Sequence, residues 1–295
     1  MDTAELIRRV RRVEIKTRGL ARNVFYGGYH SAFKGRGMSF SEVRQYQFGD
    51  DVRSIDWNVT ARTGDPHIKI FEEERELTVL LIVDISGSAF FGTGNVLRQE
   101  FITEVSAALA FSADANNDRV GLLLFSDKVD FYLPPQKGRQ HTLRILRELL
   151  NVQPNSRNTN LGNALGFARN VLRKRSVCFI LSDFWADNYE QPLRVLARKH
   201  DITGIHCWDS LETAMPDVGL LCTRDAETGA LNWIDTSDRN TRAQYAREFG
   251  DNRANTASLL RRAGADYLGM DTKAAYSTEL MHFFEKRAKR QDFSK

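Results

Sequence analysis

The chain has 295 residues, of which 42% are hydrophobic and 27% charged, and its formal net charge is +4. These proportions are ordinary for a globular protein, and no apolar run approaches the roughly 20 residues that a membrane-spanning helix needs. The first twenty residues also lack the apolar core of a secretory signal, so we expect a cytoplasmic protein.

The cysteines and the basic residues indicate which redox environment and which partners to expect. The three cysteines, Cys178, Cys207 and Cys222, lie in apolar runs typical of strands, which favours buried, reduced thiols over disulfides. Basic residues crowd both ends of the chain, and such surfaces can attract nucleic acid or anionic lipid. The ends lack the interleaved aromatic residues that bind single strands, so we expect a solvated helix face and no nucleic-acid partner. A peripheral membrane contact stays open as an alternative.

Residues 1–76 are predicted to be a helix followed by a small strand-rich subdomain. Four apolar residues repeat at helical spacing near the start: Leu6, Ile7, Val10 and Val13. A glycine-rich stretch follows, and turn signals at Gly49-Asp50 and at Gly64-Asp65-Pro66 then separate short segments.

Residues 77–295 are predicted to form a doubly wound, mainly parallel α/β sheet of Rossmann-like type. Four nearly continuous apolar runs, LTVLLIVD, RVGLLLFS, SVCFILSD and ITGIHCWD, are typical of strands buried on both faces. Helical stripes separate them, and strand–helix alternation with short loops is the pattern of a doubly wound sheet. A hairpin around residues 227–229, a helix over 239–263, a short strand ADYLGM and a last helix complete the chain.

Oxygen-bearing side chains follow these strands at the edge where open α/β sheets bind ligands. The first strand ends in Asp84, Ser86 and Ser88, and the SVCFILSD strand leads into Asp183. Thr159 stands just before a predicted helix. Carboxylates and hydroxyls are hard oxygen ligands of the kind that Mg²⁺ prefers. Two carboxylates and three hydroxyls leave at least one coordination position open, for water or for a carboxylate from elsewhere.

Four aromatic residues closely follow these candidate ligands: Phe90, Phe91, Phe184 and Trp185. Aromatic side chains of this kind often pack beneath helices. They can also form an apolar rim around a metal site, which a protein partner covers. Both alternatives stand at this point, and the four residues are our candidates for partner binding. We also expect the ligand-bearing loop to lie at the surface.

The same residues resemble a known site. The D-x-S-x-S motif after a buried strand, the threonine of NTNLG and the aspartate of LSD are together similar to the metal-ion-dependent adhesion site (MIDAS) of von Willebrand factor A domains. The upstream stretch RQYQFGDDVRSIDWNVTARTGDPHIKIFEEE, with DAETG and FFEKRAKR downstream, resembles the bacterial family called domain of unknown function 58. The resemblance covers nearly the whole chain.

This resemblance implies a function. The implied metal is Mg²⁺ or Mn²⁺, held by Asp84, Ser86, Ser88, Thr159 and Asp183. Such domains bind proteins through the metal, whose open position takes an acidic side chain of the partner. Members of the family are often encoded beside MoxR-type AAA+ ATPases, which implies an adaptor or co-chaperone that binds the ATPase or its client.

A metal-dependent, phosphatase-like hydrolase using the same site is the alternative. A haloacid-dehalogenase-like phosphatase would need D-x-D with a nucleophilic first aspartate, but the third position here is Ser86. The chain has neither a G-x-x-x-x-G-K-[ST] phosphate loop nor a G-x-S-x-G elbow. Nothing in the sequence supplies an obvious general base beside the metal, so we expect a non-enzymatic protein.

Overall fold

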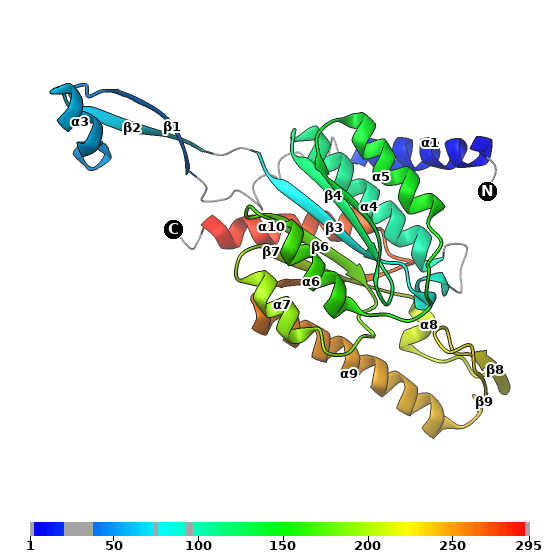
Figure 1. Cartoon of the computed structure of the whole chain (residues 1–295). Helices are drawn as coiled ribbons and strands as arrows, with labels where there is room; N and C mark the ends of the chain where they lie inside the picture. The colour runs from blue at the N-terminus through cyan, green and yellow to red at the C-terminus, as the bar shows by residue number, and fades with distance from the viewer. Residues whose placement is uncertain (1–2, 21–37, 74–75, 93–96, 293–295) are drawn as a thin grey trace. The chain divides into compact units, whose positions relative to one another are not determined.

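A computed structural model describes residues 3–20, 38–73, 76–92 and 97–292. The chain forms two compact units, one of residues 34–77 and one of residues 1–33 together with 78–295 (Figure 1). This division differs from the expected boundary at residue 76, because the N-terminal helix groups with the larger unit. That helix, α1 (Thr3–Leu20), packs on two helices of the larger unit and buries Val13 and Thr17 there.

The smaller unit is an antiparallel strand pair with a short helix between its strands. Strand β1 (Met38–Gln45) pairs with β2 (His67–Glu73), and a 3-10 turn η2 (Val52–Ser54) and helix α3 (Trp57–Thr63) connect them. Asp56 caps α3 by accepting hydrogen bonds from the first backbone N–H groups of the helix.

The larger unit contains a six-stranded sheet in the order β10-β7-β6-β3-β4-β5. All neighbouring strands run parallel except β4 and β5, which are antiparallel. The strands are β3 (Thr78–Asp84), β4 (Arg119–Phe125), β5 (Val129–Gln136), β6 (Val177–Ser182), β7 (Asp201–Trp208) and β10 (Asp266–Asp271). The predicted fold class, a mainly parallel doubly wound α/β sheet, is therefore confirmed.

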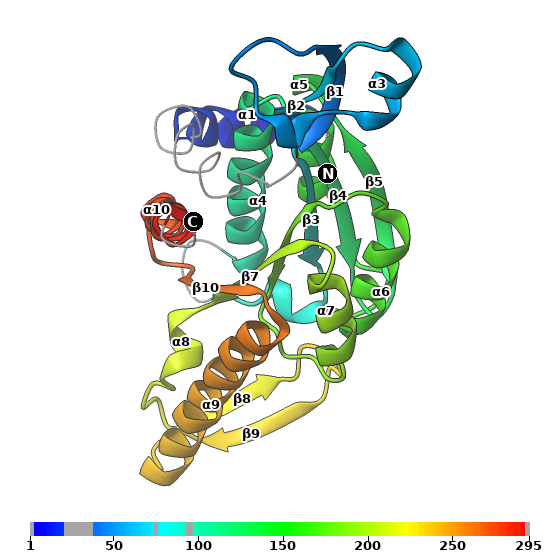
Figure 2. The ribbon, with the colours of Figure 1, turned by 90° about the vertical axis from the view of Figure 1, so that its left-hand side faces the viewer.

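Helices cover both faces of this sheet. The helices on one face are α1, α4 (Arg98–Ala115), α5 (Arg139–Asn151) and α10 (Tyr276–Asp292), and those on the other are α6 (Leu161–Val171), α7 (Glu190–Ala197) and α9 (Arg239–Ala263) (Figure 2). Among the described helices, none combines the length and the apolar character needed to cross a membrane.

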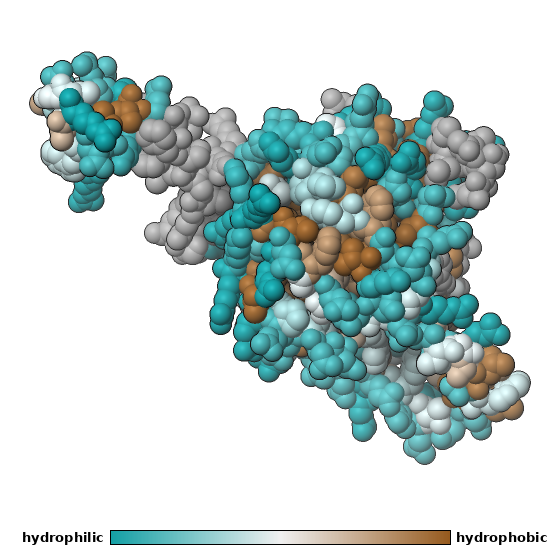
Figure 3. Space-filling view, in the orientation of Figure 1, coloured by the Kyte–Doolittle hydropathy of each residue, from teal (hydrophilic) through white to brown (hydrophobic). Residues whose placement is uncertain are grey.

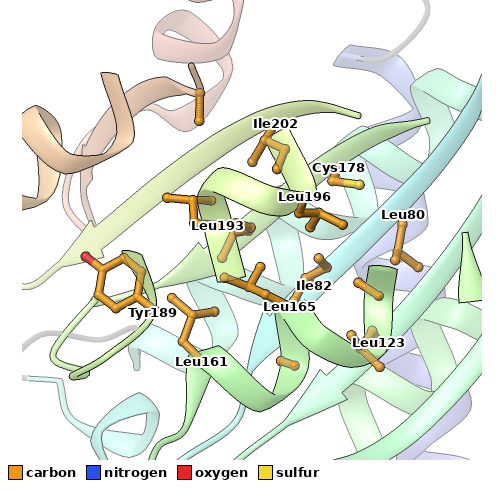
Figure 4. Close-up of a cluster of buried hydrophobic side chains, with 14 of the residues drawn as sticks. Leu80, Ile82, Leu123, Leu161, Leu165, Cys178, Tyr189, Leu193, Leu196 and Ile202 are labelled. Carbon is orange, nitrogen blue, oxygen red and sulfur yellow. The ribbon is translucent and has the colours of Figure 1, made fainter. Parts of the chain in front are cut away.

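The core follows from the alternation of side chains along each strand. Leu80 and Ile82 of β3 point to the face covered by α6, α7 and α9, where they pack with Cys178, Leu193 and Leu165 (Figure 4). The intervening residues of β3 are equally buried and point to the opposite face. Burial on both faces explains why the strands are continuous apolar runs in the sequence.

Two segments differ from the sequence-based expectation. Strand β5 was not predicted; it is the last strand of the sheet order, and it contains Pro134 and Pro135. Strands β8 (Leu220–Arg224) and β9 (Leu231–Asp235) form the expected hairpin, but Cys222 is exposed there, whereas Cys178 and Cys207 are buried. Hairpin residues are exposed because this two-stranded sheet lies outside the main core.

Candidate functional site

The candidate ligands lie where the connections of the sheet change direction. The connection from β3 leads to β4 on one side, whereas the connection from β6 leads to β7 on the other. Strands β3 and β6 are neighbours, with Val83 opposite Leu181, so their carboxyl ends form the switch point of the sheet. Ligands of open α/β sheets bind in the crevice at such a point. Asp84 ends β3 there, and Asp183 directly follows β6.

Asp84 is held in place from both strands. Its Oδ1 accepts a hydrogen bond of 2.9 Å from the backbone N–H of Ser86, and its Oδ2 accepts one of 2.6 Å from the hydroxyl of Ser182 at the end of β6. Asp84 is only 3% exposed. Burial, followed by the negative charge of Asp183, raises the pKa of Asp84.

Asp183 is oriented by an arginine that sequence reasoning missed. Arg98 Nη1 donates to Asp183 Oδ2 at 2.6 Å and to the carbonyl oxygen of Ser88 at 3.0 Å. The same guanidinium pairs with Glu212 in the short helix α8 (Ser210–Thr213), and Asp183 Oδ1 accepts a bond of 3.2 Å from the N–H of Trp185. Arg98 is 1% exposed.

A signal for this arginine is present in the sequence. Arg98 is the first residue of α4, where the helix dipole disfavours a positive charge. Because Arg98 is also buried, its charge needs nearby carboxylates. Burial disfavours its charge, but Asp183 and Glu212 outweigh burial and raise the pKa of the guanidinium.

The three hydroxyl-bearing candidates lie on two neighbouring loops. The Oγ atoms of Ser86 and Ser88 are 3.2 Å apart in the loop and 3-10 turn η3 (Gly87–Phe90) that follow β3. The N–H of Gly87 donates to the carbonyl oxygen of Arg157 at 2.9 Å, which ties this loop to the one that carries Thr159. The two loops and the end of β6 thus meet at one edge of the sheet.

The donor set fits a small divalent cation. It has two carboxylates and three hydroxyls, all hard oxygen donors. In the described part of the chain, no three side chains of His, Cys, Asp or Glu gather as a metal-binding group, so hydroxyl oxygens are needed to complete a coordination sphere here. The two buried carboxylates repel each other, and Arg98 pairs with only one of them, Asp183, which favours a further cation beside them.

The expected position of the loop at the surface is corrected by the structure. Asp84, Ser86 and Asp183 are buried, and only Ser88 and Thr159 are half-buried. Their burial follows from the hydrogen bonds to Ser182 and Arg98, which draw the beginning of the loop onto the strand ends. Variants at the buried positions therefore need a separate measurement of stability.

The four aromatic candidates fall into different classes. Phe184 is 2% exposed and packs on Tyr189 and His206, so it belongs to the core and the assignment to a partner-binding rim is wrong for it. Its left-handed backbone (φ 54°) turns the side chain inward directly after Asp183. Trp185 and Phe91 are 48% and 42% exposed, and the side chain of Phe90 lies outside the described residues.

The fold and the position of D-x-S-x-S at a central strand end define a mainly parallel, doubly wound α/β protein. Within that class, residues 42–255 match the model of the family "Protein of unknown function DUF58", and the chain belongs to this family. It is 31% identical to the uncharacterized protein Rv1480 of Mycobacterium tuberculosis over 290 residues, 97% of this chain and 91% of that protein. It is 30% identical to the uncharacterized protein YeaD of Bacillus subtilis over 109 residues, 37% of this chain and 25% of that protein.

Solved structures with similar folds have low sequence identity. An aerotolerance-related membrane protein from Bacteroides fragilis has a TM-score of 0.49 at 14% identity, covering 72% of this chain and 99% of that one. The SpRpn10 VWA domain has a TM-score of 0.42 at 14% identity, covering 70% of this chain and 94% of that one.

Proposed function

We propose that this protein is a non-enzymatic, metal-dependent protein-binding adaptor. In this proposal Asp84, Ser86, Ser88, Thr159 and Asp183 hold Mg²⁺ or Mn²⁺, some directly and some through water. The bound ion would attract an acidic side chain of a protein partner. The observation that carries the proposal is the convergence of hard oxygen donors from two loops and two strand ends at the switch point of the sheet.

The chain's own residues prepare this site in three ways. Ser182 and the N–H of Ser86 fix both oxygens of Asp84, and Arg98 fixes one oxygen of Asp183. These contacts hold the donors in place before any ion arrives, which lowers the entropic cost of assembling the site. Two carboxylates leave a divalent ion with residual positive charge, because Arg98 already offsets part of their negative charge.

The surroundings of the site suit a protein surface. Trp185 and Phe91 stand exposed beside the candidate ligands, and exposed aromatic side chains are enriched in protein interfaces. The guanidinium of Arg98 lies 5.9 Å from the centre of the Phe91 ring, which helps to hold that ring in position. Apolar contacts around the ion would offset the reluctance of Mg²⁺ to lose water.

The family resemblance suggests the partner, a MoxR-type AAA+ ATPase or a client that it remodels. The test is a co-precipitation of the ATPase with the full chain in Mg²⁺ and in EDTA. We expect EDTA and the Asp84→Asn variant each to abolish most of the binding. Asparagine matches aspartate in size and still accepts a hydrogen bond from Ser86, so the melting temperature of the variant shows whether the fold is kept. Equal binding in both buffers and by both proteins would contradict the proposal.

The non-enzymatic part of the proposal has its own test. We expect no hydrolysis of a general phosphatase substrate by the wild-type chain in Mg²⁺ or Mn²⁺. A turnover that the Asp84→Asn variant lacks would instead favour the phosphatase-like alternative at the same strand ends.

A further inference from the structure

The tip of the β8–β9 hairpin is a hydrogen-bonded turn. Asp225 Oδ1 accepts hydrogen bonds from the N–H groups of Glu227 and Thr228 at 3.1 and 2.6 Å, and also from the Thr228 hydroxyl at 2.7 Å. Gly229 adopts a positive φ of 73°, which closes the turn without strain. The turn therefore presents its residues in fixed directions.

Glu227 is the residue that this turn directs toward the candidate site. Its neighbours Ala226 and Thr228 are exposed, whereas Glu227 is half-buried. Its Oε1 accepts a hydrogen bond of 2.9 Å from the Oγ1 atom of Thr159, one of the five proposed ligands. A carboxylate of this same chain thus reaches the edge of the site where a partner's acidic side chain is expected.

The close approach of the tip depends on a glycine of the D-x-S-x-S motif. A Cβ atom placed on Gly87 would collide with the carbonyl oxygen of Ala226 and would lie 3.2 Å from the Cβ atom of Arg157. The hairpin tip, the Thr159 loop and the loop after β3 therefore pack at one point. Because the contact to Ala226 is to backbone, a side chain at residue 87 would have to push the tip away.

The charges at this point favour a cation between the groups. Asp84 and Asp183 already repel each other in the buried part of the site, and Arg98, which pairs with Asp183, is shared with Glu212. A further carboxylate at the edge of such a site is repelled unless positive charge lies near it, from a metal ion or from an arginine such as Arg157, whose guanidinium lies beside Gly229 of the tip. The repulsion of the Glu227 carboxylate is offset if it faces the ion.

We propose that Glu227 is the chain's own acidic group for the metal and reaches it through one water, since Asp84, Asp183 and Glu227 do not gather as a direct ligand group in this structure. It would occupy the position that the partner's carboxylate takes, so the hairpin tip closes the site until a partner displaces it. This inference rests on the proposed metal-dependent function and adds a means of regulating it. A partner carboxylate then binds the ion more weakly than it would in the absence of Glu227, because the two carboxylates compete for one position.

The first test is isothermal titration calorimetry of the full chain with Mn²⁺ alone. We expect Glu227→Gln to weaken Mn²⁺ binding by about 10-fold, the lower end of the effect of losing a supporting residue at a metal site. The matched control is Asp235→Asn, which changes the net charge equally. Asp235 lies on the same hairpin, is exposed, and accepts a bond from Ser237 that asparagine can also accept. We expect wild-type affinity for this control.

The second test reads the tip itself by amide hydrogen exchange over residues 225–230. We expect Mg²⁺ to slow exchange at the tip in the wild-type chain and in Asp235→Asn, but not in Glu227→Gln or in Gly87→Ala, where the tip is pushed outward. If wild type and Glu227→Gln bind Mn²⁺ equally and Mg²⁺ leaves exchange at the tip unchanged, Glu227 is not a ligand, while the metal site stands. If the wild-type chain binds no Mn²⁺, the proposed metal site itself is wrong, and this inference with it.

Discussion

The central strands and the β8–β9 hairpin meet at the same candidate site but are built in opposite ways. Every residue of β6 is buried, as is every residue of β3 after the first, whereas neither β8 nor β9 has a buried residue. The hairpin instead exposes large apolar and aromatic side chains, among them Leu220, Leu231 and Trp233. Figure 3 shows a hydrophobic patch over this part of the molecule. The strand ends at the site are therefore held in place by the core, whereas the hairpin is held there by the contacts of its tip.

The largest expected effect lies in the sheet. Phe179 is fully buried in β6, and Phe179→Ala should lower the free energy of unfolding by about 3–5 kcal/mol, because it removes apolar contacts and leaves a cavity. Urea unfolding followed by circular dichroism measures this loss. A loss below about 1 kcal/mol would mean that the strand is far less tightly packed than the structure indicates.

Arg98 joins the residue after β6 to helix α8, and its removal should cost nearly as much. Arg98→Met leaves Asp183 and Glu212 without their shared cation, and breaking a buried ion pair in this way costs about 3 kcal/mol or more. Urea unfolding of Arg98→Met, Asp183→Asn and the double variant forms a mutant cycle. We expect the double variant to lose less than the sum of the two single losses; strict additivity would contradict the direct coupling.

A smaller effect is expected where the hairpin leads into helix α9. Asp238 caps this helix by accepting hydrogen bonds from the N–H groups of Asn240 and Thr241 at 3.0 and 3.3 Å. Asp238→Ala should reduce stability by about 1 kcal/mol, whereas Asp238→Asn keeps the cap and should change it little. Thermal unfolding of both variants distinguishes the lost cap from the lost charge.

The smallest effect is expected on the exposed hairpin face. Trp233 is 67% exposed, and Trp233→Ala should change the free energy of unfolding by less than about 0.5 kcal/mol despite the size of the side chain. The measurement is the same urea titration as for Phe179→Ala. A loss above about 1 kcal/mol would remove the contrast between the buried central strands and the exposed hairpin.

Most of the sheet could be predicted because its pattern is local. The strands β3, β4, β6 and β7 are continuous apolar runs, and the helices between them have regular stripes. Strand β5 escaped prediction since VDFYLPPQ is only partly buried and contains two prolines. The placement of α1 also escaped, because its stripe indicates a helix but not which unit it packs on.

In the candidate site, too, only the features with a local signal in the sequence could be predicted. The strand-end positions of Asp84 and Asp183 follow from the order of elements, which a sequence reveals. The contacts of Arg98 with Asp183 and of Glu227 with Thr159 join residues 85 and 68 positions apart, and spacing alone indicates neither. Phe184 was misassigned because its inward direction depends on a left-handed backbone at a non-glycine residue, which no local pattern signals.

The two prolines of β5 have a consequence for how copies of this protein meet. An outermost strand offers its free N–H and C=O groups as a template on which another chain can add a strand. Pro134 and Pro135 have no N–H groups, and because successive N–H groups of a strand point to opposite sides, one of the two missing donors belongs to the free edge of the strand that ends the sheet order. Growth of the sheet from molecule to molecule is thereby disfavoured at this edge, and we expect β5 to help protect the protein against fibrillar aggregation.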